Sequence, residues 1–368
     1  MTYRGRRFSI GLAGYRIVVV RIRNILLTAL VASTAGAQSM PARLTTFLTG
    51  TAGFTGDEIG RAASGTAIVK VLSAPDSREV ALIGAERVDV PRAFYVARVA
   101  VAGPSPGDSS SNRPRVFSDP AVPGDVAGFA LTDNDVNDLL KCHPGSCKLK
   151  LPGTAMVAMR AGLDPASASR DSAASAAFGQ RMVDYVNTYR TRGNAALVEY
   201  EDQPQATGAA QVWDGMLSQS PYVYTEMPSL ARYLSEYPND RPSGMHDAIF
   251  WTQENIPGGQ PLVTVTHQVV YDPPEMTGTT VVASKQLYCD HYLDGEFDLM
   301  AIADPAPSSS DQKQAAYVLF IRRLHFDDLP SGGIINIRGK VIGRSRDLTQ
   351  QQLRDTKRAS EQAFTSAH

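Results

Sequence analysis

The sequence predicts an α+β protein in which a curved antiparallel β-sheet wraps a long C-terminal α-helix, with a helical insertion beside the sheet. Residues 262–326 form apolar-alternating runs separated by polar turns that carry Pro or Gly, a pattern typical of antiparallel strands. Residues 131–240 instead place apolar side chains three and four positions apart, as amphipathic helices do. From residue 332 onward, one apolar face continues over the length of a long helix.

The N-terminal 37 residues are expected to be a secretory signal peptide. Arg21 and Arg23 precede a short apolar run, and small residues at 35–37 predict cleavage after Ala37. A membrane-spanning helix needs about 20 apolar residues, and the uninterrupted run here is about half as long. There is also no cysteine beside the cleavage site to carry a lipid. We therefore expect a periplasmic or secreted protein.

The mature chain is expected to be one domain. Residues 38–64 hold clusters of Thr and Gly and are predicted to be a flexible segment, with a short helix near 56–63. The domain then covers 65–368. It opens with two strands on either side of the turn at 75–77, and Pro91 is expected to begin a helix.

The helical insertion is expected to occupy about 115–245. Thr132 is a candidate N-cap followed by acidic residues, which the helix dipole favours in a first turn. The longest predicted helix spans about 167–200, where Phe178, Met182 and Tyr185 belong to one apolar face, and Gly193–Asn194 is expected to kink or end it.

Two of the three cysteines are expected to form a disulfide. Cys142 and Cys147 bracket a tight segment with a Pro-Gly turn signal, and an exported protein meets oxidising conditions. A metal knuckle with His143 would lack a second ligand pair, and haem attachment would need a histidine after Cys147. Cys289 lies within an apolar strand and is expected to be buried.

The charge balance argues against nucleic acid as a partner. The chain has 36 basic and 37 acidic residues, and outside its two termini no basic run is interleaved with aromatics. Its hydrophobic fraction of 43% is that of a soluble globular protein able to bury a sizeable core.

Each of three predicted strands carries one histidine on its more apolar face: His267, His291 and His325. Three imidazoles from neighbouring strands could bind a metal if their heights on the sheet agreed. They could equally be core residues, or polar groups in an otherwise apolar pocket. No metal or cofactor is predicted. Arg323 is expected on the same face as His325, in an ion pair with Asp298 or Glu296 or with an anionic ligand.

The order of these elements resembles the helix-grip architecture of START-type lipid-transfer domains. The resemblance rests on residues 65–94, 283–295, 317–332 and 339–364. It implies a curved sheet around the C-terminal helix, with a hydrophobic ligand between the two. The segment 115–245 departs from the family pattern, in which two helices would suffice.

The predicted function is therefore an exported protein that binds, and in the cell envelope transfers, a lipid-like or sterol-like molecule. Peripheral contact with a membrane is compatible with this role, and the pattern does not set an oligomeric state. The alternative is a secreted hydrolase or a metal-dependent enzyme that uses the sheet histidines, although no hydrolase or phosphate-loop motif occurs. The residues expected to contact the ligand are Trp251, His267, Tyr271, Tyr288, His291, Tyr317, Arg323, His325, Ile334, Ile337 and Val341.

Overall fold

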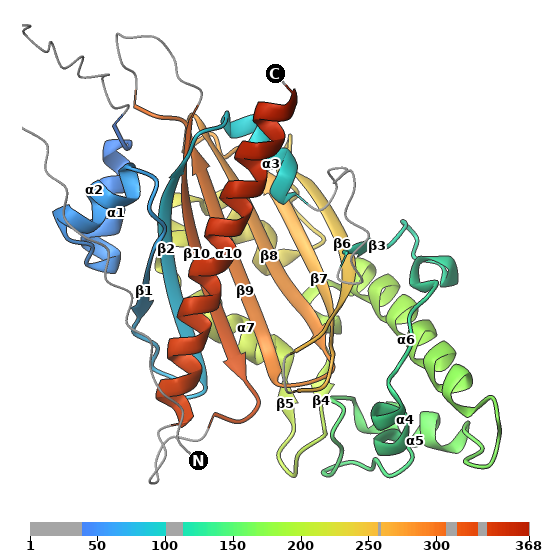
Figure 1. Cartoon of the computed structure of the whole chain (residues 1–368). Helices are drawn as coiled ribbons and strands as arrows, with labels where there is room; N and C mark the ends of the chain where they lie inside the picture. The colour runs from blue at the N-terminus through green and yellow to red at the C-terminus, as the bar shows by residue number, and fades with distance from the viewer. Residues whose placement is uncertain (1–38, 101–112, 257–258, 307–314, 330–336, 368) are drawn as a thin grey trace, which may run out of the picture. The chain divides into compact units, whose positions relative to one another are not determined.

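An eight-stranded antiparallel sheet forms the centre of the computed structural model (Figure 1). The structure describes residues 39–100, 113–256, 259–306, 315–329 and 337–367, all within one structural unit. The strands are β1 (Ile68–Leu72), β2 (Glu79–Val88), β3 (Arg115–Val116), β6 (His246–Glu254), β7 (Leu262–Tyr271), β8 (Thr279–Cys289), β9 (Leu293–Ala303) and β10 (Ala316–Phe326). Their order is β1-β2-β10-β9-β8-β7-β6-β3, and every neighbouring pair is antiparallel. The predicted α+β class and antiparallel sheet are confirmed.

One face of the sheet is covered by α10 (Ile337–Ala367) and α3 (Arg92–Val99), which Figure 1 shows in front of the strands. Alternate strand residues such as Phe320 and Ile302 pack there with Tyr95 of α3 and Leu353 of α10. Nearer the start of α10, Val341 contacts a smaller cluster around Leu82. The long C-terminal helix against the sheet is thus confirmed.

The opposite face is covered by the helical insertion, so the sheet lies between two helical layers. We call this the insertion face; Ile83, Val265 and Phe297 are buried there. The insertion contains α4 (Asp133–Leu139), α5 (Gly153–Ala161), α6 (Arg170–Arg192), α7 (Ala209–Ser218), α8 (Pro221–Glu226) and α9 (Pro228–Glu236), the 3-10 turns η1 (Pro123–Val126) and η2 (Gly193–Ala196), and a two-stranded ribbon of β4 (Glu199–Tyr200) and β5 (Thr207–Gly208).

The longest insertion helix ends at the Gly193–Asn194 pair, which the sequence marked as its kink or end, and the reason is Gly193. This residue has a φ of 56°, and a Cβ there would lie 1.6 Å from the Tyr237 carbonyl oxygen. Only glycine fits this close backbone approach. Helix α6 therefore ends at Arg192 and the chain turns back toward the sheet.

The segment predicted to be flexible is instead mostly helical, in α1 (Ala42–Ala52) and α2 (Gly56–Ala63). Leu48 and Phe54 are buried in the core of the insertion face. Thr55 and Glu58 form a reciprocal capping box that begins α2, the helix expected near 56–63. The Thr- and Gly-rich composition of this segment gave no sign that Leu48 and Phe54 would be buried in the core.

The predicted disulfide joins Cys142 and Cys147 just after α4. Because it closes a short loop, loop-closure entropy gives it about 2 kcal/mol of stabilisation. We expect a Cys142→Ala/Cys147→Ala variant to lose this amount in urea unfolding. The variant should match the wild type measured in dithiothreitol, and an unchanged midpoint without reductant would contradict the prediction.

Among the described residues, none of the helices is both long and apolar enough to cross a membrane.

Candidate ligand-binding pocket

The predicted ligand-contacting residues do not meet in one pocket. The sheet separates the two on α10 from the rest, and those on the insertion side belong to different core clusters and cavities. Those that lie on the insertion side are Trp251, His267, Tyr271, Tyr288, His291, Tyr317, Arg323 and His325. Helix α10 covers the other face, with Val341 against the sheet and Ile337 exposed on the helix. Ile334 lies outside the described residues. Strand parity predicted correctly which side chains of β7 and β10 share a face, but the helix expected to cover them lies on the opposite side. In β8 the parity prediction was wrong, because a bulge puts both Leu287 and Tyr288 on the insertion side and the strand ends before His291.

A cavity of about 230 Å³ does exist between α10 and the sheet. Half of its lining is polar, unlike the hydrophobic cavity that the resemblance implies. The lining residues are Tyr95, Arg98, Val99, Gln268, Val282, Ser284, Asp298, Met300, Phe320, Gln352, Leu353 and Thr356.

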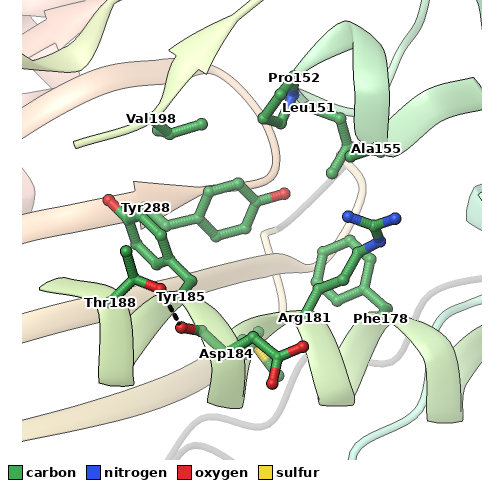
Figure 2. A pocket seen from close by; sticks show the side chains of 11 residues that line it. Leu151, Pro152, Ala155, Phe178, Arg181, Asp184, Tyr185, Thr188, Val198 and Tyr288 are labelled. Atoms are coloured by element: carbon green, nitrogen blue, oxygen red, sulfur yellow. Dashed lines mark hydrogen bonds between the residues drawn. The ribbon is translucent and has the colours of Figure 1, made fainter. Parts of the chain in front are cut away.

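A more apolar pocket of about 250 Å³ opens on the insertion side, between α5, α6 and β8 (Figure 2). Its lining residues are Leu151, Pro152, Ala155, Phe178, Arg181, Met182, Asp184, Tyr185, Thr188, Val198 and Tyr288. Helix α6 supplies the largest share because Phe178, Met182 and Tyr185 recur on one helical face. Tyr288, from β8, is the one predicted ligand residue that lines it.

Two tyrosine rings meet edge to face in this pocket, with their centroids 6.4 Å apart, and both hydroxyls are already bonded to the protein. Tyr185 donates to the Leu287 carbonyl oxygen at 2.6 Å, and Tyr288 donates to the Lys150 carbonyl oxygen at 2.8 Å. Burial raises the pKa of both phenols, so both remain donors at neutral pH. The rings consequently offer apolar surface to a ligand.

The polar side chains of the pocket are few and come from α6. Arg181, Asp184 and Thr188 project from this helix, and Figure 2 shows the Arg181 guanidinium on the same side as Ala155. Thr188 Oγ1 donates to the Asp184 carbonyl oxygen within the helix. An apolar interior with a few placed polar groups is the composition of a small-molecule site.

His267 is a buried core residue. Its Nε2 lies 3.1 Å from Asp247 Oδ2, and its Nδ1 lies 3.1 Å from the Tyr189 hydroxyl. Burial lowers the pKa of His267, which favours the neutral ring, with Nε2 donating and Nδ1 accepting. Burial opposes ionisation of Asp247 too, but hydrogen bonds from His267 and Tyr233 lower its pKa to about 2.

His291 lies in the turn between β8 and β9 and contacts α4. Its Nε2 is 3.1 Å from Asp135 Oδ1, and its Nδ1 is 3.1 Å from the Lys148 carbonyl oxygen. Burial alone would lower the pKa of His291, but these bonds and the charge of Asp290 raise it. Both ring nitrogens act as donors when the ring is protonated.

His325 lies between two carboxylates, with Nε2 3.2 Å from Asp76 Oδ2 and Nδ1 3.2 Å from Asp294 Oδ2. Asp294 also binds the buried ammonium of Lys150 at 2.7 Å. His325 lines a polar cavity of about 230 Å³ together with Arg78, Glu79 and Gln219.

The three histidines therefore do not form a metal site. Each has its own carboxylate partner from a different element, and the described residues hold no group of three or more His, Cys, Asp or Glu side chains arranged for a metal ion.

Arg323 forms the expected internal ion pair, but with a different partner. It binds Glu79 of β2 and donates to the Gln219 carbonyl oxygen at 2.5 Å. The predicted partners, Glu296 and Asp298, instead bind Arg322, which points to the α10 face. Since β10 lies between β9 and β2, Arg322 on one face pairs with carboxylates of β9, and Arg323 on the other face pairs with a carboxylate of β2.

The remaining predicted aromatics are core residues. Trp251 donates its indole N–H to the Asp125 carbonyl oxygen at 3.0 Å. Tyr271 and Tyr317 pack in the core of the insertion face, and the Tyr271 hydroxyl lies 3.3 Å from Ser229 Oγ.

Comparisons with protein-family models, with curated proteins and with solved structures give no match.

Proposed function

We propose that the protein is exported and binds a small apolar or amphipathic molecule in the pocket between α5, α6 and β8. The observation that carries the proposal is the aromatic, mostly apolar lining, whose tyrosine hydroxyls are occupied by backbone carbonyls. The START-like order of sheet and closing helix, together with the predicted signal peptide, supports a lipid-binding role in the cell envelope.

The pocket volume narrows the ligand class. An apolar cavity of about 150 Å³ holds one benzene ring, and drug-sized ligands occupy about 300–1,000 Å³. A pocket of about 250 Å³ suits a single acyl chain or a molecule of one or two rings better than a whole sterol. Arg181 makes this ligand's polar end most compatible with a carboxylate.

A tryptophan at Thr188 should block the pocket. We expect Thr188→Trp to weaken binding of dodecanoate at least tenfold in calorimetric titration, because the indole fills space that the acyl chain needs.

Native mass spectrometry of wild type from the periplasm should show co-purified ligand on a chain that begins at Gln38.

Thr191→Trp is the matched control. Thr191 also lies on the exposed side of α6 and bonds only to carbonyls of its own helix, yet it does not line the pocket. If both tryptophans weaken dodecanoate binding equally, the site is elsewhere. If the wild type binds no dodecanoate and carries no ligand, the proposed class of ligand is wrong.

The alternative of a secreted hydrolase is favoured by one arrangement, at His325. An imidazole between Asp76 and Asp294, on the wall of a polar cavity, has the parts of a general acid–base pair. No Ser or Cys side chain is among the residues that line that cavity, which leaves the Thr207 hydroxyl or a water molecule as the nucleophile.

A further inference from the structure

Helix α10 concentrates positive charge that the rest of the chain does not have. Its 31 residues include seven Lys or Arg and three Asp or Glu, whereas the whole chain has a net charge of −1. Four of the basic residues fall within 338–346, in the first third of the helix. A cluster of four or more basic residues on a helix is typical of binding to anionic lipids.

Two of these four basic residues have no partner among the residues that the structure describes. Arg338 donates to the Ser77 carbonyl oxygen, and Arg346 binds Asp347. Lys340 and Arg344 are exposed, and neither forms an ion pair or side-chain hydrogen bond within the described part of the chain. Their charges are therefore available to an external anion.

Exposed apolar side chains lie on the same face of the helix. Ile337, Lys340, Arg344 and Leu348 are spaced by three, four and four residues, which places them along one line on the helix surface. Leu348 is 53% exposed, more than any other large hydrophobic side chain described, and Ile337 is 42% exposed. The buried residues Thr349, Leu353 and Ser360 mark the opposite face, toward the sheet.

We propose that this stripe, Ile337–Lys340–Arg344–Leu348, docks the folded protein on the surface of an anionic membrane. The cations would lie among the lipid phosphates while the two aliphatic side chains enter the acyl boundary. A nucleic acid would use the cations but gain nothing from exposed Leu348 and Ile337. The stripe shares no residue with the proposed ligand pocket. The membrane-docking proposal and the ligand-binding proposal can therefore fail independently.

Vesicle co-sedimentation tests the proposal with the mature full-length protein. We expect binding to vesicles that contain phosphatidylglycerol, weakening at high salt, and little binding to pure phosphatidylcholine. Lys340→Gln/Arg344→Gln should lower the partition coefficient at least tenfold, since each cation contributes roughly fivefold. Leu348→Ser should lower it less, without changing the salt dependence.

The control variant is Lys141→Gln/Arg232→Gln, which removes the same charge from exposed positions in the insertion. It should bind as the wild type does. Equal loss of vesicle binding in both double variants would mean unspecific electrostatic attraction and would overturn the proposal. Failure of the wild type to bind either kind of vesicle would also overturn it, and would leave a protein as the partner of this face. Unchanged thermal midpoints would show that all variants are folded.

Discussion

Replacing Arg323 with methionine is expected to lower the free energy of unfolding by about 3–5 kcal/mol. Arg323 is 3% exposed and its partner Glu79 is 1% exposed, so the pair lies in the core of the insertion face. Methionine removes the guanidinium but leaves the Glu79 carboxylate buried without its cation, which is far more costly than the lost attraction itself. Urea unfolding at pH 7 measures the difference.

The double variant Glu79→Gln/Arg323→Met separates these two terms. Because it removes both charges, it should recover most of the stability lost in Arg323→Met. A single variant that costs less than about 1 kcal/mol would show that water reaches Glu79 and that the pair behaves as a surface salt bridge.

The sheet could be predicted because its signal is local. Alternation along residues 262–326 sets which side chains share a face, and β7 indeed places Val263, Val265 and His267 together on the insertion face. Parity says nothing about which helical layer covers that face. The closing helix was assigned to the histidine side, whereas it packs against the other side through Val341 and Leu353.

The pocket could not be predicted because it is assembled from distant segments. Its lining includes Leu151 from the segment just before α5, Phe178 from α6 and Tyr288 from β8. No local sequence pattern brings these three residues together. The periodicity of α6 did identify an apolar face containing Phe178 and Tyr185, but a helical face that packs in a core has the same spacing as one that lines a pocket. The partner of Arg323 was missed for a similar reason, since Glu79 on β2 is 244 residues away in sequence.

Glu86 should make the protein less stable as the pH rises. It lies on β2 beneath α10, fully buried, and neither carboxylate oxygen has a hydrogen-bond partner among the described residues. Burial raises the pKa of Glu86 to about 7, although the charges of Lys357 and Arg354 act in the opposite direction, and Glu361 adds to the increase. The nearby phenol of Tyr95 is also buried, with a raised pKa, and remains neutral.

The sign follows from which state holds the proton more tightly. The ordinary pKa of a glutamate is 4.5, so between about pH 4.5 and 7 the unfolded chain releases a proton that the folded protein retains. Stability contributed by neutral Glu86 is present below pH 4.5, falls through this window and stays low above pH 7. We expect Glu86→Gln, which keeps the shape without the charge, to raise the free energy of unfolding by roughly 3 kcal/mol at pH 8 and to change little at pH 4.

Urea unfolding of the wild type and Glu86→Gln at several pH values between 4 and 8 tests this, because the difference between the two isolates Glu86 from other titrating groups. Glu361→Gln is the control, since Glu361 lies on α10 close to the same site but is partly exposed and binds Lys357. It should show no comparable pH-dependent gain. A Glu86→Gln variant that is equally destabilised at every pH would mean that the carboxyl has a hydrogen-bond partner that the amide cannot replace, and the buried charge beneath α10 would then not limit stability.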